Sequence, residues 1–217
     1  MQYVSELFAA IQNWLKQSGL IPLSAIVTVI LFVTREILDS RRKKHARTNE
    51  IRALKRILAR ECELNWYLSN QISDICSIFK LTKHNGYQLY NLELTQTPSR
   101  KTRFEIIGYE YNKGKGVLFE PQVVTFKEYL YEVVKVDVVF YERVEPAYEA
   151  ALELKQLRDS LVDIANTDEW VDNDSMMLDF SEYANKEIKS INKRLKILYQ
   201  FCTGKELSLD LVTNKNQ

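Results

Sequence analysis

Glycine and proline are scarce in this sequence, with six glycines and four prolines among 217 residues. Neither of them occurs between residues 23 and 85. Because glycine and proline are the residues that a helix interior tolerates least, this uninterrupted stretch predicts one long helix. The same scarcity excludes collagen-like chains and Gly- or Pro-rich low-complexity chains. We find no internal repeat either, and the sequence therefore predicts an ordinary folded domain.

Cysteine and histidine are also rare. The three cysteines are Cys62, Cys76 and Cys202, and the two histidines are His45 and His84. The cysteine number is odd and the spacings match no zinc motif, which predicts buried free thiols in a reducing compartment. Neither histidine has a neighbouring metal-ligand partner. We therefore expect no metal and no cofactor, and because no catalytic motif is present we do not expect an enzyme.

Two short stretches begin like ligand-binding loops. Residues 172–175 start like a calcium loop, but the glycine at the sixth position and the glutamate at the twelfth are missing. Gly114 and Gly116 alternate with lysines, but the G-K-[ST] ending and the strand–loop–helix context of a phosphate loop are missing. Residues 172–175 therefore favour a solvated loop, and Gly114 and Gly116 favour a turn.

Charge is absent from residues 17–34, which are eighteen consecutive uncharged residues. At a rise of ~1.5 Å per residue they cover ~27 Å, close to the ~30 Å of a bilayer's hydrocarbon core. We therefore predict a single transmembrane helix over residues 17–38, in which the hydroxyls of Ser24 and Thr28 return to the helix's own carbonyls. A cleaved signal peptide, a buried helix of a soluble core and a shallow or re-entrant helix remain as alternatives. The predicted membrane anchor consists of Leu20, Ile21, Leu23, Ile26, Val27, Val29, Ile30, Leu31, Phe32 and Val33.

Basic residues follow this segment at once. Residues 41–60 hold nine Lys and Arg against the single acid Glu50, and we read residues 39–60 as a basic juxtamembrane helix. Such a segment attracts anionic headgroups. Nucleic acid could use the same charges, but it is not the expected partner because the membrane interpretation needs no additional one. The positive-inside rule then predicts an outside amino terminus and a cytoplasmic carboxyl-terminal domain, as in a bacterial inner membrane. The predicted contacts with anionic lipid are Arg41, Arg42, Lys43, Lys44 and Arg47.

Before the apolar segment, residues 1–16 carry an apolar helical face and predict an amphipathic helix that lies in the outer interface. After the basic segment, residues 61–205 predict a cytosolic helical domain. Apolar residues recur there at steps of three and four, with Glu61 and Asn65 in two of the positions, and form a seam for either an oligomer or a bundle. The seam residues are Ile51, Leu54, Leu58, Leu68, Ile72, Ile75 and Phe79.

The rest of this domain is predicted from local signals. Thr125 and Glu128 form a capping-box pattern that begins a helix, which Pro146 kinks or restarts and which ends near Ile164; the β-branched run 133–139 leaves a strand as the alternative. A loop over 167–175, a last helix over 176–202 with Gly204 as its stop, and a flexible tail over 206–217 complete the chain. The predicted fold class is mainly α: a single N-terminal transmembrane helix plus a cytosolic antiparallel helical bundle with a small β-hairpin insertion.

The β insertion spans about 87–124 and is rich in aromatic and β-branched residues. Residues 112–116 predict its hairpin turn. Core packing is the simpler role for its aromatic residues, and stacking on a nucleotide is the alternative. These aromatic residues are Tyr87, Tyr90, Phe104, Tyr109, Tyr111 and Phe119.

These features predict a single-pass membrane-anchored protein whose helical domain binds a partner or ligand and acts by assembly at the membrane. A homo-oligomer or a protein partner is expected, in the role of a sensor, a scaffold or a membrane-acting effector. Analogy of layout alone suggests bacterial stress or phage defence. The alternative is a membrane-anchored domain that senses a nucleotide or another small ligand through its aromatic β insertion.

Overall fold

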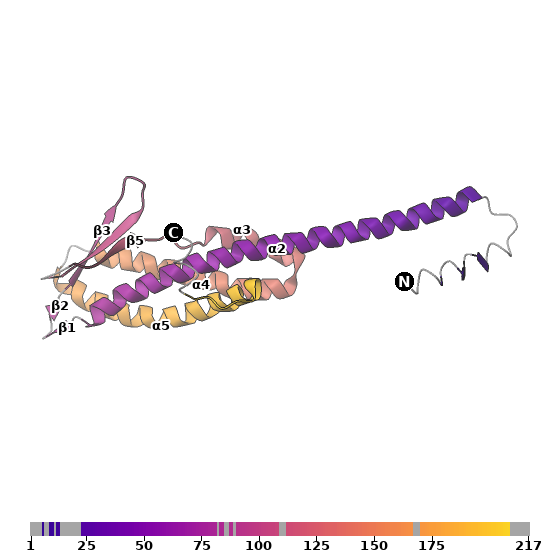
Figure 1. Ribbon diagram of the computed structural model, residues 1–217. Coiled ribbons are helices and arrows are strands. Elements are labelled where there is room, and N and C mark those ends of the chain that lie inside the picture. Colours follow the sequence, from indigo (N-terminus) through magenta and orange to yellow (C-terminus); the bar gives the residue numbers. More distant parts are fainter. Residues whose placement is uncertain are drawn as a thin grey trace. The chain divides into compact units, whose positions relative to one another are not determined.

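The computed structural model of the protein describes residues 6, 9–10, 12–13, 23–81, 83–84, 87–88, 90–108, 112–166 and 170–208 (Figure 1). The chain divides into two compact units, Met1–Glu50 (unit 1) and Ile51–Gln217 (unit 2). The boundary falls inside the segment 39–60 that the sequence presented as one juxtamembrane helix. Within the predicted interfacial helix over residues 1–16, the described residues are 6, 9–10 and 12–13, and these are helical.

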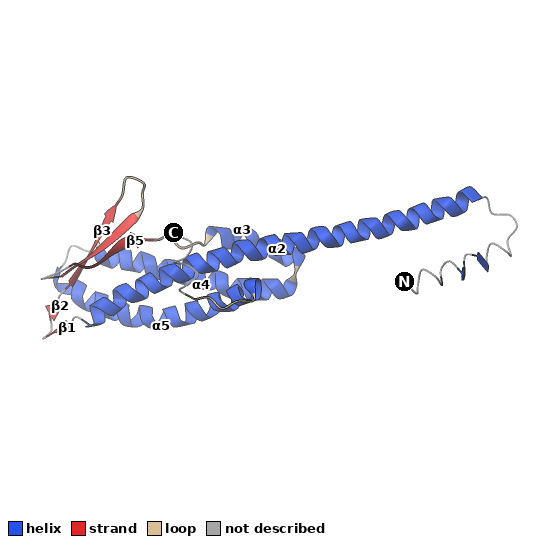
Figure 2. Ribbon diagram, viewed as in Figure 1, coloured by secondary structure: helices blue, strands red, loops and turns tan. Residues whose placement is uncertain are grey.

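Helices dominate the described part of the chain (Figure 2). They are α2 (Leu23–Leu81), α3 (Val124–Val136), α4 (Val138–Ala165) and α5 (Trp170–Thr203). The predictions of a mainly helical protein and of one long helix after residue 22 are confirmed, since α2 runs for 59 residues without a break. The predicted loop over 167–175 is wrong from residue 170 onward, because α5 already begins at Trp170.

The predicted capping box at Thr125 is wrong. Helix α3 begins at Val124 with Val123 at its N-cap, and no side chain caps it. The Thr125 hydroxyl instead forms a hydrogen bond with the Glu61 carboxyl on α2. The hydroxyl therefore bonds a residue of another helix and does not cap α3 as the local pattern had predicted.

The β-branched run 133–139 forms neither a strand nor a continuous helix. Asp137 has extended backbone angles, φ −158° and ψ 113°, and separates α3 from α4. Its carboxylate accepts hydrogen bonds from the backbone N–H groups of Val139 at 2.9 Å and Phe140 at 3.2 Å. This is an aspartate N-cap, and it restarts the helix nine residues before Pro146, which lies inside α4.

The β insertion contains a three-stranded antiparallel sheet in the order β3-β4-β5, formed by Tyr90–Gln96, Thr102–Gly108 and Asn112–Leu118. A separate two-stranded ladder joins β1 (Lys83–His84) to β2 (Tyr87–Gln88). The turn between β3 and β4 is closed by the Thr97 N–H donating to the Lys101 carbonyl at 2.9 Å, with Arg100 at a φ of 60°.

The predicted turn at residues 112–116 is wrong, because these residues lie within β5. Gly116 pairs with Phe104 of β4. A Cβ atom on Gly116 would approach the Phe104 ring to 2.8 Å, so a larger residue would have to displace the ring. The glycine at this position is explained by side-chain packing across the strands and not by a turn.

Much of α2 lies in the core of unit 2. Leu58, Cys62, Leu68 and Ile72 are fully buried. Figure 1 shows α2, α4 and α5 lengthwise beside one another, with the sheet at one end. Hydrogen bonds fix an antiparallel α2–α5 pair: Ser69 bonds Asn192 at 2.5 Å, and the next turn of α2 bonds an earlier turn of α5 through Ser73 and Asn185 at 3.2 Å.

The carboxyl-terminal end of α5 follows the sequence prediction at Gly204. Its φ is +71°, and its N–H donates to the Gln200 carbonyl at 2.7 Å, which is a left-handed helix stop. The predicted flexible tail begins too early, because Leu207 is buried with 4% of its surface exposed. The remaining residues of that tail, from 209 onward, lie outside the described part of the chain.

Asn65 ties α2 to the segment that leads into α3. Its side chain donates to the Gln122 carbonyl at 3.1 Å and accepts from the Gln122 N–H at 2.8 Å. Because Asn65 is fully buried, we predict that Asn65→Ala lowers the free energy of unfolding by about 1–3 kcal/mol, the cost of leaving buried backbone groups unpaired. Urea denaturation measures this loss, with the exposed Gln200→Ala as control; equal losses in the two variants would contradict the assignment.

Candidate functional site

The amino-terminal part of α2 has its polar side chains satisfied within the helix. The Thr28 hydroxyl donates to the Ser24 carbonyl at 2.8 Å, and the Thr34 hydroxyl donates to the Ile30 carbonyl at 2.7 Å. A hydroxyl bonded back to its own helix leaves no donor that requires water. The sequence prediction for Thr28 is therefore confirmed, and this part of α2 presents an almost wholly apolar surface.

Large apolar side chains of this segment are exposed on every side of the helix. Successive residues of an α-helix are separated by ~100°, so the consecutive residues 29–33 point in all directions around α2. A helix that is apolar all round is typical of a core or of a membrane environment. The exposed fractions are Val27 48%, Val29 60%, Ile30 44%, Leu31 64%, Phe32 66%, Val33 39%, Ile37 49% and Leu38 48%.

The predicted transmembrane helix is not supported by the described helices. None of them is both long enough and apolar enough to cross a membrane. The reason is that α2 begins at Leu23, and Arg35, Glu36 and Asp39 fall within its first eighteen residues. The first six residues of the predicted span, 17–22, which include the predicted anchor residues Leu20 and Ile21, lie outside the described residues.

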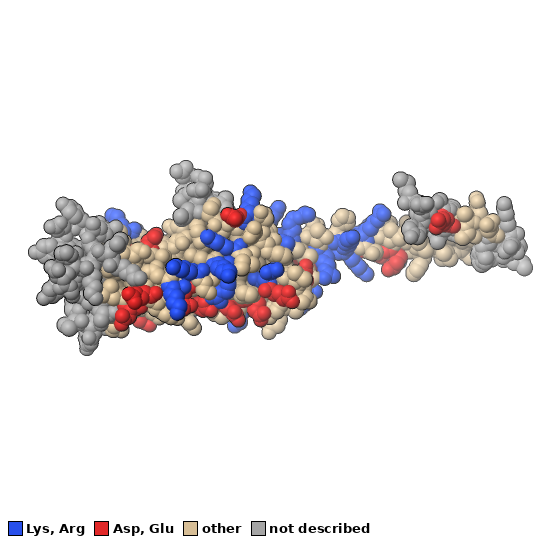
Figure 3. Space-filling model, turned by 90° about the horizontal axis from the view of Figure 1, so that it is seen from below, with Lys and Arg blue, Asp and Glu red and all other residues tan. Residues whose placement is uncertain are grey.

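A cationic collar follows, which we define as Arg41, Arg42, Lys43, Lys44 and Arg47. All five side chains are exposed, and four of them are consecutive, so they surround the helix and do not form a one-sided stripe. Asp39 lies between two arginines on the same helix, at 3.8 Å from Arg35 and 3.9 Å from Arg42. Figure 3 shows Lys and Arg gathered over this part of α2.

Inside unit 2, the seam residues predicted from the sequence are part of the protein's own core. Six of the seven are buried, and only Ile51 is half-exposed. The buried Glu63 lies among them, where it accepts from Arg60 at 2.9 Å and from the Tyr199 hydroxyl at 3.2 Å. The structure thus uses this face of α2 inside a single chain.

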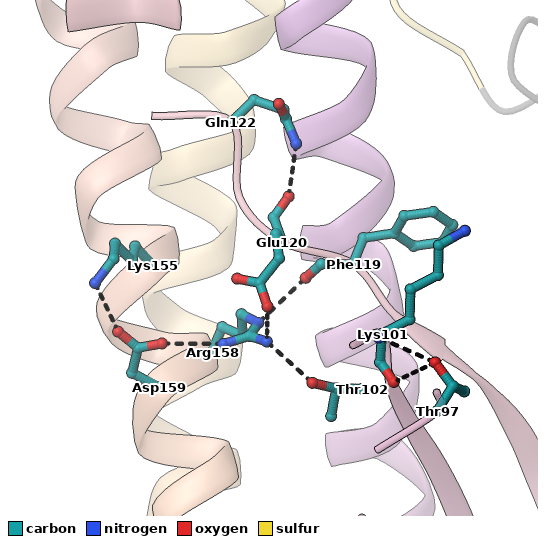
Figure 4. Close-up of polar contacts among 9 residues, drawn as sticks. All are labelled: Thr97, Lys101, Thr102, Phe119, Glu120, Gln122, Lys155, Arg158 and Asp159. Atoms are coloured by element: carbon teal, nitrogen blue, oxygen red, sulfur yellow. Dashed lines mark hydrogen bonds and ion pairs between the residues drawn. The ribbon is translucent and has the colours of Figure 1, made fainter. Parts of the chain in front are cut away.

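A buried arginine, which the sequence did not reveal, connects α4 to the β insertion (Figure 4). Arg158 has 8% of its surface exposed. Its guanidinium bonds the Glu120 carboxylate, the Thr102 hydroxyl at 3.3 Å and the Phe119 carbonyl at 3.2 Å, and it contacts the neighbouring Asp159 at 3.2 Å. These four acceptors surround the guanidinium, so Arg158 holds α4 against the β insertion and has little room for a substrate.

A second cation, Lys55, packs against aromatic rings of the core. The Lys55 ammonium lies 4.1 Å from the centroid of the Phe201 ring and 5.7 Å from that of Phe140. It also donates to the Phe201 carbonyl at 3.5 Å. Cation–π contacts of this kind join α2 to α4 and α5, so Lys55 belongs to the core packing although the sequence places it in the basic segment.

The thiols of Cys62 and Cys202 lack the lowered pKa of a nucleophile. Burial raises the pKa of Cys202 to about 12, although the nearby Lys55 acts in the opposite direction. Burial also raises the pKa of Cys62 well above its ordinary value. Reactive cysteines need a lowered pKa, and both groups are shifted the other way. Among the described residues, no cluster of His, Cys, Asp and Glu could hold a metal ion.

The two aromatic residues of the β insertion whose side chains are described, Phe104 and Phe119, make separate contacts. Phe119 packs edge-on against Tyr67 of α2, with ring centroids 5.3 Å apart, while Phe104 covers Gly116. Tyr109 and Tyr111 lie outside the described residues. The sheet does carry an open depression of about 430 Å³, lined by Thr95, Arg103, Phe104, Glu105, Lys115, Gly116 and Val117.

Comparisons of the chain with protein families, with curated proteins and with solved structures found no match.

The partly buried Glu61 predicts a pH-dependent contribution to the stability of unit 2. Burial raises its carboxyl pKa above 4.5, against the opposing effects of the Arg60 guanidinium and the Thr125 hydrogen bond. The folded state therefore binds this proton more tightly than the unfolded state, so the carboxyl reduces stability as pH rises from 4.5 through its folded pKa. We predict that Glu61→Gln stabilises the protein at pH 7 and that its advantage disappears near pH 4.

Urea midpoints measured from pH 4 to pH 7 test this expectation. The exposed Glu128→Gln serves as control, because it removes the same charge outside the core. An advantage of Glu61→Gln that stays constant with pH would contradict the assigned shift.

Proposed function

We propose that the chain is a single-pass membrane-anchored protein whose helical unit binds a partner and acts by assembly at the membrane. The observation that carries this proposal is the exposure of apolar side chains on every side of α2 between Val27 and Val33. In water such a surface is costly, at roughly 25 cal/mol for each Å² of apolar area. A bilayer covers it on all sides at once.

The proposed span is residues 17–34, of which α2 supplies residues 23–34. Arg35 ends the uncharged stretch, and its long side chain can extend back toward the headgroups with its charge in water. The cationic collar comes next along the same helix. Each Lys or Arg near an anionic surface contributes about 1 kcal/mol, and a ring of cations suits a helix that leaves the bilayer among headgroups.

Charge asymmetry supports a direction for this anchor. Residues before the uncharged segment contain Lys16 as their single cation, whereas the collar follows it. Positive residues remain preferentially on the cytoplasmic side. The proposal therefore places the amino terminus outside and unit 2 in the cytoplasm, as for a protein of a bacterial inner membrane.

Continuity of α2 supports a role in assembly or signalling. The helix that carries the exposed apolar segment also supplies the core residues Leu58, Leu68 and Phe79 of unit 2. A partner that repacks the core of unit 2 would act on the helix that enters the membrane. This is the proposed link between binding and the membrane, and it suits a sensor, a scaffold or a membrane-acting effector.

We predict that charges within the apolar segment release the protein from membranes. Each aspartate at the centre of a spanning helix costs about 2.5–3.5 kcal/mol, so Ile30→Asp with Leu31→Asp and Phe32→Asp should move the protein into the soluble fraction. The control is Tyr183→Asp with Ile197→Asp, two exposed apolar residues of α5. Flotation and carbonate extraction measure the distribution.

A wild-type protein that fails to float, or a triple variant that floats as well as the control, would refute the membrane anchor. Protease access from each side of sealed vesicles then tests the direction. Digestion of unit 2 only from the cytoplasmic side is the expected result.

The depression on the sheet favours a second candidate, a membrane-anchored unit that senses a nucleotide. Its volume of about 430 Å³ is within the range of small-ligand sites. Arg103 on β4 and Lys115 on β5 are both exposed and line it, with Glu105 between them. The two cations suit phosphate groups, and the carboxylate suits ligand hydroxyl or amine donors.

This second candidate predicts that a nucleotide raises the melting temperature of the full chain. Arg103→Gln with Lys115→Gln should abolish the rise, because both cations of the depression are removed. Arg100→Gln with Lys101→Gln is the matched control, since these exposed cations lie in the neighbouring turn. No rise with a panel of nucleotides, or equal loss in both double variants, would rule out this site.

A further inference from the structure

A groove on the exposed part of α2 carries charges of both signs. It is open, has a volume of about 380 Å³ and follows the helix from Leu31 to Arg42. Since successive residues are separated by ~100°, its lining side chains fall within an arc of about 140°. The lining residues are Leu31, Thr34, Arg35, Leu38, Asp39 and Arg42. They form one continuous surface, which belongs entirely to unit 1.

The charged groups of the groove alternate in sign. The Asp39 carboxylate lies 3.8 Å from the Arg35 Nε and 3.9 Å from the Arg42 Nη1. Both distances exceed those of a hydrogen bond, so the three groups attract one another without being locked into a bonded cluster. The two arginine side chains are 83% and 82% exposed. The groove therefore suits a molecule that itself carries neighbouring charges of both signs.

The remainder of the groove is largely apolar. Leu31 is 64% exposed and Leu38 is 48% exposed. The Thr34 hydroxyl already donates to the Ile30 carbonyl at 2.7 Å. A small water-soluble zwitterion would engage the charges and leave both leucines in water, whereas a lipid would cover them as well. The charges and the leucines together indicate an amphipathic ligand.

We infer that this groove binds the headgroup of an aminophospholipid. The phosphate accepts hydrogen bonds from Arg35 and Arg42, the primary ammonium donates to Asp39, and an acyl chain covers Leu31. At ~1.5 Å per residue, Leu31 lies ~4.5 Å inside the end of the proposed span at residue 34, and Asp39 lies ~7.5 Å beyond it. The headgroup layer is about 5–7 Å thick on each side of a bilayer. The apolar end of the groove therefore lies among acyl chains, and its charged end lies among headgroups.

Asp39 sets the selectivity among phospholipids. A primary ammonium, as in ethanolamine and serine headgroups, offers N–H donors to the carboxylate, whereas the quaternary ammonium of choline offers none. The headgroup of phosphatidylglycerol has no cation, so Asp39 repels its negative charge. The inference rests on the membrane anchor of the proposed function and adds a lipid class to it. The cationic collar, of which Arg42 is a part, would by itself favour anionic lipids, so the two contributions can be separated.

The test is lipid retention by the full chain in detergent micelles that contain equal amounts of phosphatidylethanolamine, phosphatidylcholine and phosphatidylglycerol with identical acyl chains. Native mass spectrometry counts the lipids that stay bound. The wild type should retain the ethanolamine lipid about threefold or more over the choline lipid, which is within the range of an exposed ion pair. Asp39→Asn should remove this preference and increase retention of the glycerol lipid. Glu36→Gln is the matched control, because it removes an exposed acid of the same turn that does not line the groove.

The arginines are tested by Arg35→Gln with Arg42→Gln. This double variant should lower the retention of all three lipids, because each of them carries a phosphate. Lys43→Gln with Lys44→Gln removes the same charge outside the groove and should retain the ethanolamine lipid as the wild type does.

Equal retention of the ethanolamine and choline lipids by the wild type, or an equal loss of preference in Glu36→Gln and Asp39→Asn, would overturn the inference. Free phosphoethanolamine in excess should not displace the bound lipid, and displacement would overturn the assignment to a lipid. Flotation separates the two proposals. A wild type that floats without a preference has the anchor and lacks this site, and a wild type that does not float contradicts both.

Discussion

Burial of most of α2 within unit 2 is the constraint on which the rest of that unit depends. Between Leu54 and Phe79 the exposed residues are Arg56, Arg60, Asp74 and Ser77, and the remaining surface of the helix is buried or half-buried. Asn65, Gln71 and Ser69 bond the segment before α3, strand β5 and α5 respectively. A polar side chain buried on this helix costs free energy unless it is paired inside the protein, so its partner determines how the neighbouring element is placed.

Those partners occur at regular intervals. Asn185, Asn192 and Tyr199 of α5 are seven residues apart, and they bond Ser73, Ser69 and Glu63 of α2 respectively. A shift of α5 by one turn would leave several of these groups buried without partners, at a cost of about 1–3 kcal/mol each. Apolar contacts alone would tolerate such a shift better. The polar ladder therefore fixes the register of two helices whose apolar faces are nearly uniform.

The sequence predicted what depends on one element and missed what depends on two. The absence of glycine and proline was enough for α2, and Gly204 was enough for the end of α5. The capping box failed because Glu61, 64 residues earlier in the chain, takes the Thr125 hydroxyl. Gly116 appeared to be a turn residue because the ring that excludes a side chain there, Phe104, belongs to another strand. Arg158 had no local signal at all, since Glu120, its ion-pair partner on the β-insertion side, is 38 residues away.

The same reasoning explains why candidate surfaces are easier to predict from the sequence at the start of α2 than in unit 2. A surface that is apolar or charged on all sides of a helix can be recognised from consecutive residues, because no neighbour is needed to complete it. Residues 29–33 and 41–44 are of this kind, and both are exposed. The outer side of α3 becomes visible only when the structure shows which of its two apolar sides is buried. Phe126 and Val133 take the inside of α3, and that choice leaves Tyr131 outside. An exposed apolar residue is therefore informative in this protein where its own helix has already buried a competing face.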